Sequence, residues 1–146
     1  MSTIGFWIKN SRSVALPQSA LPCLTAIVLC IGQDGFTWWL ALPVLLGVCA
    51  VHLGMNLADD YFDYKHDSRT RADISSTSIR ARMEKCHYLG QGEGKATISQ
   101  LGWATTGFLA FAALMGAIAF AAQWLLHGWQ AAMGIVIYAA AGLFLG

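Results

Sequence analysis

The residues best suited to chemistry lie in one stretch between Asn56 and Asp67. Asp60, Asp63 and Asp67 are spaced i, i+3 and i+7. On a helix with 3.6 residues per turn, these three carboxylates share one face. Asn56 falls in the same sector of roughly 60°, and Asp59 lies at its edge. The spacing therefore predicts a stripe of oxygen-bearing side chains along one side of a helix.

Carboxylates gathered on one helical face repel each other unless a cation neutralises them or water screens them. Mg²⁺ prefers oxygen ligands and often binds one or two carboxylates together with substrate phosphates. The stripe therefore predicts a Mg²⁺ site for a diphosphate, where the metal stabilises the leaving group. We expect Asn56 to act as a neutral ligand or to orient a carboxylate. Six basic residues nearby could bind the outer phosphate oxygens: Lys65, Arg69, Arg71, Arg80, Arg82 and Lys85.

The same charges also have a simpler interpretation, which stays open. A run of charged residues often marks nothing more than a solvated helix end at the membrane boundary. Four oxygen-bearing side chains in one sector, at the end of an apolar helix, favour a functional site. An EF-hand is excluded, because the glycine at its sixth position and the glutamate at its twelfth are both absent.

The composition shows what kind of protein must hold this stripe. Of the 146 residues, 56% are hydrophobic and 12% are charged, against about 25% charged in an ordinary globular protein. The mean hydropathy is +0.52. These values exclude a disordered chain, a basic nucleic-acid-binding domain and a disulfide-rich secreted module. They indicate a membrane protein, with the lipid bilayer as its surroundings and no nucleic acid as a partner.

The charges are confined to one island. Fourteen of the 17 charged residues lie between Asp59 and Lys95, with long apolar blocks on either side. Each block can hold two spans of about 20 residues, so the sequence predicts an all-α, polytopic transmembrane helix bundle with about four spans. Breaks at 32–35 and 127–128 separate the spans within each block. The predicted spans are 16–31, 36–58, 98–126 and 129–146, and the loop is 59–97.

The basic residues predict the orientation of the chain. Lys9 and Arg12 precede the first span, seven further Lys or Arg residues lie in the island, and the two short breaks contain none. The positive-inside rule then places the N-terminus and the loop 59–97 in the cytoplasm. We expect a multi-pass protein of the cell's inner (plasma) membrane, and Met1–Lys9 has no features of a cleavable signal.

Residues 59–67, DDYFDYKHD, resemble the first aspartate-rich motif, NDxxDxxxD, of the UbiA superfamily of intramembrane prenyltransferases. The wider string NLADDYFDYKHD is most similar to the branch that prenylates 1,4-dihydroxy-2-naphthoate in menaquinone biosynthesis. Arg12 before the first span and Gly94 before the third also fit the family layout. The resemblance implies a bundle of about nine helices with a lateral opening to lipid. It also implies Mg²⁺-dependent transfer of an isoprenyl group from an isoprenyl diphosphate to an aromatic acceptor.

The resemblance assigns roles to individual residues. Asp60, Asp63 and Asp67 match the three motif aspartates, which makes them catalytic and metal-binding. Asp59 stands where the family usually has asparagine, and its extra charge either tightens metal binding or marks a different acceptor. Asn56 matches an earlier asparagine of the naphthoate-type pattern. The bound diphosphate is expected to contact Lys65, Arg69, Arg71 and Arg80.

The family carries a second aspartate-rich motif on a later helix, beyond Gly146 in this layout. We therefore expect residues 1–146 to be the N-terminal part of a prenyltransferase domain, or a truncated gene product, inactive alone. The rival hypothesis is a small non-enzymatic membrane protein that binds a divalent cation or a partner through its charged loop. Hydropathy excludes the soluble isoprenyl diphosphate synthases, whose DDxxD motif also matches DDYFD.

Four further side chains each have two possible roles. His52 lies inside the second span, where a hydrogen bond between helices is the first expectation and a functional role the alternative. Tyr61, Tyr64 and Tyr88 are expected to anchor the chain at the membrane interface, or else to border an aromatic acceptor.

Overall fold

The computed structural model describes residues 4–70, 86–90 and 93–145. This part of the chain is helical apart from turns and one isolated bridge, which confirms the all-α prediction for it. The short elements are α1 (Ile4–Asn10), η1 (Ser13–Ala15) and η2 (Trp38–Leu40). The long helices are α2 (Pro17–Cys30), α3 (Ala41–Thr70), α5 (Ile98–His127) and α6 (Trp129–Leu145).

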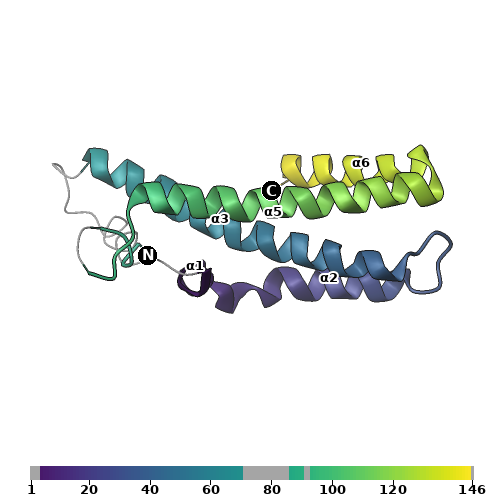
Figure 1. The fold of residues 1–146 in the computed structure, drawn as a ribbon, viewed down its shortest axis with the longest axis horizontal. Helices are drawn as coiled ribbons and strands as arrows, with labels where there is room; N and C mark the ends of the chain where they lie inside the picture. The colour runs from purple at the N-terminus through teal and green to yellow at the C-terminus, as the bar shows by residue number, and fades with distance from the viewer. Residues whose placement is uncertain (1–3, 71–85, 91–92, 146) are drawn as a thin grey trace.

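The long helices run back and forth, side by side (Figure 1). Helix α3 packs against both α2 and α5, and α6 folds back along α5. Helix α1, the end of α3, residues 86–90 and the start of α5 gather at one end of the molecule, which we call the polar end. The turns at 31–37 and at Gly128 lie at the opposite end.

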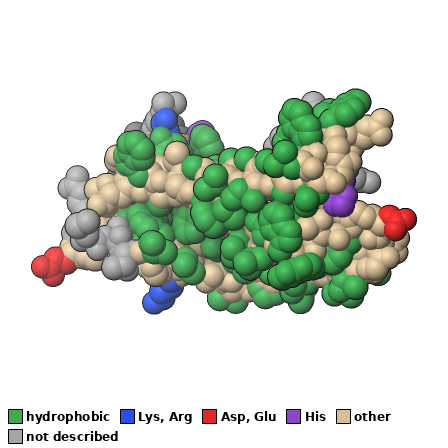
Figure 2. Space-filling model, turned by 45° about the vertical axis from the view of Figure 1, so that its right-hand side comes forward, with side chains coloured by type: hydrophobic (Ala, Val, Ile, Leu, Met, Phe, Trp, Pro, Cys, Tyr) green, Lys and Arg blue, Asp and Glu red, His purple; other side chains and the backbone are tan. Residues whose placement is uncertain are grey.

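Three helical segments are long and apolar enough to cross a membrane, which supports the prediction of a membrane protein. They are Ser13–Cys30, Trp38–His66 and Ile98–His127. Hydrophobic side chains cover the middle of the face in Figure 2, and acidic and basic side chains lie toward its two ends. Helix α6 occupies the region of the fourth predicted span, but it has 17 residues and is not among the three segments.

Local sequence signals set the ends of the helices. Proline opens α2 at Pro17, where its missing N–H would have no helical partner. Thr97 caps α5, since its hydroxyl accepts from the Gln100 amide at 3.2 Å and the Gln100 side chain accepts from the Thr97 amide at 3.0 Å. Gly128 (φ 86°) separates α5 from α6, because a positive φ interrupts the helix and is readily adopted only by glycine.

Helix α3 holds both the second predicted span and the aspartate stripe. The sequence predicted a span over 36–58 and a helical stripe over 56–67 within the loop 59–97, and α3 runs without a break from Ala41 to Thr70. Its 30 residues are about 45 Å long, against about 30 Å for the hydrocarbon core. The aspartate motif is therefore carried on a helix long enough to cross the hydrocarbon core and to continue beyond it.

Two glycines let α3 and α5 approach closely. A Cβ on Gly47 would lie 3.2 Å from Met115 Cβ, and one on Gly54 would lie 3.0 Å from Leu109 Cδ2. The two glycines are seven residues apart and therefore share a face of α3. Small residues at such positions bring helix backbones close enough to gain dispersion contacts, the main attraction between helices in lipid.

A hydrogen bond joins α2 to α3 inside the apolar region. Ser19 Oγ and His52 Nδ1 are 2.8 Å apart, so the expected bond between helices is present. The other ring nitrogen, His52 Nε2, is buried and has no partner among the described residues.

A small core fills the polar end. Its buried residues come from α1, α3, α5 and the segment between α3 and α5. They are Trp7, Leu57, Cys86, Tyr88, Leu89, Ala96 and Leu101. This core holds α1 and residues 86–90 against the part of α3 that carries the first aspartates.

Candidate functional site

Asp60 is the most buried charged residue that the structure describes, with a side chain 1% exposed. Its Oδ1 accepts a hydrogen bond from the Arg12 guanidinium, and its Oδ2 accepts one from the Tyr88 hydroxyl at 2.8 Å. A buried carboxylate is tolerable only when it is paired and hydrogen-bonded. Both conditions are met here, by residues 48 and 28 positions away in the sequence.

Arg12 joins two neighbouring carboxylates. The nitrogen that binds Asp60 also lies 3.0 Å from Asp59 Oδ2, and Asp59 is 51% exposed. Burial alone would lower the pKa of the Arg12 guanidinium, but its hydrogen bonds to Asp59 and Asp60 raise that pKa above its ordinary value. Arg12 therefore supplies a fixed positive charge at the start of the aspartate stripe.

The backbone around Arg12 is held in an unusual conformation. Arg12 has φ 56° and ψ 44°, the left-handed region, which costs a residue with a side chain roughly 1–2 kcal/mol. Ser11, before it, is fully buried, and its carbonyl accepts a hydrogen bond of 2.9 Å from Asn56 Nδ2. Asn56 thus fixes the turn between α1 and η1 from the side of α3, a use of its amide that the sequence did not predict.

Tyr88 reaches Asp60 because the backbone around it is pinned. The Ala96 amide donates to the Tyr88 carbonyl at 2.8 Å, next to the isolated bridge between Leu89 and Ala96. The ring packs edge-on against Phe6, with centroids 6.0 Å apart. Burial, and then the charge of the Asp60 carboxylate, raise the pKa of Tyr88 well above its ordinary value. Tyr88 is therefore a neutral hydrogen-bond donor across the usual pH range.

The other predicted site residues fall on different parts of α3. Asp63 is half-buried and lies one turn beyond Asp60 on the same face. Lys65 lies about 140° around the helix from Asp60, with its ammonium 5.5 Å from the centre of the Tyr61 ring. The structure thus brings Asp59 and Asp60 together around Arg12 and sets Lys65 apart from them.

Four predicted residues are covered by the structure only in part or not at all. Asp67 and Arg69 lie on the last turns of α3, with their side chains outside the described atoms. Arg71 and Arg80 lie outside the described residues altogether.

The described residues do not form a complete metal centre. Among them, no group of three or more His, Cys, Asp or Glu side chains is arranged to hold a metal ion. Mg²⁺ does not require three protein ligands, since it often binds one or two carboxylates and completes its shell with water and phosphate oxygens. The chemistry of Asp59, Asp60 and Asp63 is compatible with such binding.

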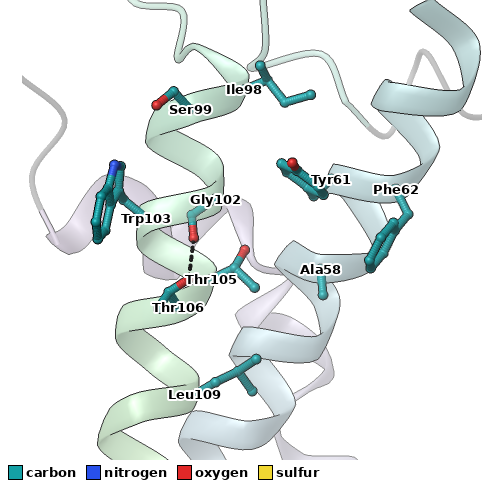
Figure 3. A pocket seen from close by; sticks show the side chains of 10 residues that line it. All are labelled: Ala58, Tyr61, Phe62, Ile98, Ser99, Gly102, Trp103, Thr105, Thr106 and Leu109. Carbon is teal, nitrogen blue, oxygen red and sulfur yellow. Dashed lines mark hydrogen bonds between the residues drawn. The ribbon is translucent and has the colours of Figure 1, made fainter. Parts of the chain in front are cut away.

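A groove of about 650 Å³ runs between α3 and α5 on another side of the same region (Figure 3). Ala58 and Phe62 line it, and each lies about 160° around α3 from Asp60. The groove and the aspartate stripe therefore occupy opposite faces of α3. The full lining is Ala58, Tyr61, Phe62, Ile98, Ser99, Gly102, Trp103, Thr105, Thr106 and Leu109.

The pairing of Arg12 and Tyr88 with Asp60 was not predicted from the sequence. Helical periodicity relates residues a few positions apart, whereas these partners are separated by tens of residues. One signal was present: Arg12 is the last charge before the first apolar block, and Asp59 and Asp60 are the first charges after the second span. Antiparallel spans bring two such positions to the same end of a bundle.

Comparison of the chain with protein-family models, curated proteins and solved structures gives no match. The resemblance to the UbiA superfamily therefore rests on residues 56–67 and on the layout of the apolar blocks.

Proposed function

We propose that this chain carries the first aspartate-rich helix of a UbiA-type intramembrane prenyltransferase. In this proposal an isoprenyl diphosphate binds at the Asp60, Asp63 and Asp67 face of α3 with Mg²⁺, beside Asn56 and Asp59. The isoprenyl group is then transferred to an aromatic acceptor similar to 1,4-dihydroxy-2-naphthoate. The observation that carries the proposal is the motif DDYFDYKHD on a helix that continues out of a membrane-spanning segment.

The polar end offers groups of both charges for such a substrate. When bound, Mg²⁺ would neutralise the diphosphate as it leaves. On the described part of α3, the carboxylates of Asp59, Asp60 and Asp63 are the proposed metal ligands. Arg12 keeps Asp59 and Asp60 oriented, and Arg69, Arg71 and Arg80 are proposed to bind the outer phosphate oxygens. Lys65 remains a proposed substrate contact. Because it lies about 140° around α3 from Asp60, it would meet only phosphate oxygens that extend around the helix.

The first step of this reaction, substrate binding, can be measured directly. The chain in phosphatidylcholine nanodiscs is titrated with farnesyl diphosphate by calorimetry, with and without Mg²⁺. We expect Mg²⁺-dependent binding that weakens at least about tenfold in Asp63→Asn, because a charged ligand is lost. Asp34→Asn is the matched control, since Asp34 lies at the opposite end of the molecule. Binding that does not depend on Mg²⁺, or an equal loss of affinity in both variants, would contradict the proposal.

The transfer step is a separate measurement. In the full-length protein, labelled isoprenyl diphosphate and the naphthoate acceptor are incubated with Mg²⁺ in nanodiscs, and prenylated product is followed by chromatography. Product that requires Mg²⁺ and disappears in Asp63→Asn supports the assigned chemistry.

A second candidate is a non-enzymatic membrane protein that binds a divalent cation or a partner through its charged loop. The observation in its favour is that both carboxylate oxygens of Asp60 already have protein partners, as a purely structural aspartate would. Divalent-cation binding that is unaffected by isoprenyl diphosphate distinguishes this candidate from the enzyme.

A further inference from the structure

The groove between α3 and α5 lies along two helical segments that are long and apolar enough to cross a membrane. All of its lining residues belong to these two segments. Phe62 is 67% exposed and Trp103 is 76% exposed, and both rings border the groove from different helices (Figure 3). Exposed aromatic rings of this kind normally contact bilayer lipid near the interface.

The groove presents a mainly apolar surface although four of its lining residues carry a hydroxyl group: Tyr61, Ser99, Thr105 and Thr106. Thr105 donates to the Leu101 carbonyl and Thr106 to the Gly102 carbonyl, both at 2.9 Å. Their hydroxyl hydrogens are thus used within α5, as the dashed bond in Figure 3 shows for Thr106. An occupant therefore meets mainly hydrocarbon and aromatic surface, which suits an apolar chain.

A basic residue lies where the groove approaches the polar end. Lys65 is seven residues after Ala58 and therefore on the same face of α3, about two turns nearer the helix end. Its ammonium is 5.5 Å from the centre of the Tyr61 ring, which lines the groove. Helical periodicity puts position 69, an arginine, on this face one turn further. The aspartates face the opposite side, so an anion at Lys65 would not meet them.

We propose that this groove binds one anionic phospholipid. An acyl chain packs against Tyr61, Phe62 and Trp103, and the headgroup phosphate lies at Lys65. Basic positions at the ends of transmembrane helices bind anionic headgroups, which are abundant in the cytoplasmic leaflet. A volume of about 650 Å³ is in the range of small-ligand pockets, so the groove holds part of one lipid and not several lipids. This inference does not depend on the proposed prenyl transfer.

Native mass spectrometry tests the proposal. The chain is placed in nanodiscs of equal phosphatidylcholine and phosphatidylglycerol, and the lipids it retains on release are counted. We expect about fivefold preference for phosphatidylglycerol, the effect of one basic side chain near an anionic headgroup, and loss of that preference in Lys65→Gln. Gly102→Leu should reduce retention of both lipids, because a Cβ there already lies 3.5 Å from the Tyr61 ring.

Two matched controls accompany these variants. Lys9→Gln removes an exposed basic residue from the same end of the molecule, and Gly116→Leu adds a side chain to α5 where nothing lies within 4 Å. Both should retain lipid as the unmodified chain does. Circular dichroism shows whether Gly102→Leu folds. If it does not fold, the proposal is decided by comparing the lipid preference of Lys65→Gln with that of Lys9→Gln.

Four results would overturn the proposal. They are equal retention of the two lipids by the unmodified chain, equal effects of Lys65→Gln and Lys9→Gln, displacement of phosphatidylglycerol by farnesyl diphosphate, and a dimer peak in place of lipid adducts. The third result would assign the groove to the prenyl substrate, and the fourth to a second copy of the chain.

Discussion

At the scale of single residues, the polar end depends on how the charge of Asp60 is balanced. A carboxylate that is almost inaccessible to solvent loses several kcal/mol of hydration, and Arg12 and Tyr88 replace that hydration with an ion pair and a hydrogen bond. Arg12 does so from a left-handed backbone conformation, with Asn56 holding the preceding carbonyl. Three segments of the chain are therefore joined at one carboxyl group.

The first prediction concerns Arg12. Arg12→Gln should lower the free energy of unfolding by about 2–3 kcal/mol, because it leaves a buried carboxylate without its counter-charge. The loss is smaller than for a fully buried pair, since the Arg12 side chain is 36% exposed. Unfolding by SDS in mixed micelles, followed by circular dichroism, measures it. Lys9→Gln is the control, and equal stability of the two variants would show that the pair contributes nothing.

The second prediction concerns Tyr88 and pH. Because its pKa is raised in the folded chain, Tyr88 ionises first in the unfolded state, at about pH 10. Its stabilising contribution is thus complete below pH 10 and is lost as the pH rises toward the folded-state pKa. Between pH 8 and 11, Tm should fall more steeply for the unmodified chain than for Tyr88→Phe. Parallel curves would mean that Tyr88 ionises equally easily in both states.

At the scale of helices, short sequence signals determine the structure wherever the cause is local. The proline at the start of α2, the glycines in the turns and the long apolar runs lie within a few residues of the structures they determine. The change from apolar to charged residues at position 59 does not by itself end a helix. No proline interrupts residues 59–70 and no glycine does either, so α3 continues through them.

The third prediction concerns the contact between α3 and α5. Gly54→Leu should destabilise the bundle by about 1–3 kcal/mol, since the new side chain meets Leu109 and Phe108 at 3.0–3.3 Å from its first carbon. Gly116→Leu makes the same chemical change on α5 in open space and should have little effect. Thermal unfolding in detergent compares the two. If both variants melt alike, close approach at Gly54 does not hold the helices together.

At the scale of the whole molecule, charge is placed at the ends and withheld from the middle. The described charges of the island between Asp59 and Lys95 lie at one end, while Asp34 lies in the turn at the other. This pattern allowed the sequence to indicate a membrane protein. The tertiary pairing of Arg12, Tyr88 and Asp60 required the structure, because it depends on how antiparallel helices align their ends.

The fourth prediction concerns topology. Cysteine introduced by His66→Cys or Glu93→Cys should react with a membrane-impermeant maleimide only when the cytoplasmic side is accessible, and Asp34→Cys only from the other side. The native cysteines are replaced by alanine first, so that labelling reports the new position. Labelling of position 66 from outside intact cells would reverse the orientation predicted by the basic residues.

The length of α3 has one more consequence. The helix is stiff and longer than the hydrocarbon core, so it fixes the heights of its carboxylates with respect to each other: Asp63 stands about 4.5 Å and position 67 about 10 Å above Asp60 along the axis. What the bilayer can change is the height of the whole series above the lipid, through helix tilt and local thickness. A thicker membrane should draw Asp60 and then Asp63 into the headgroup layer, and a thinner one should leave them in water. Cation binding at this helix should therefore vary with lipid chain length.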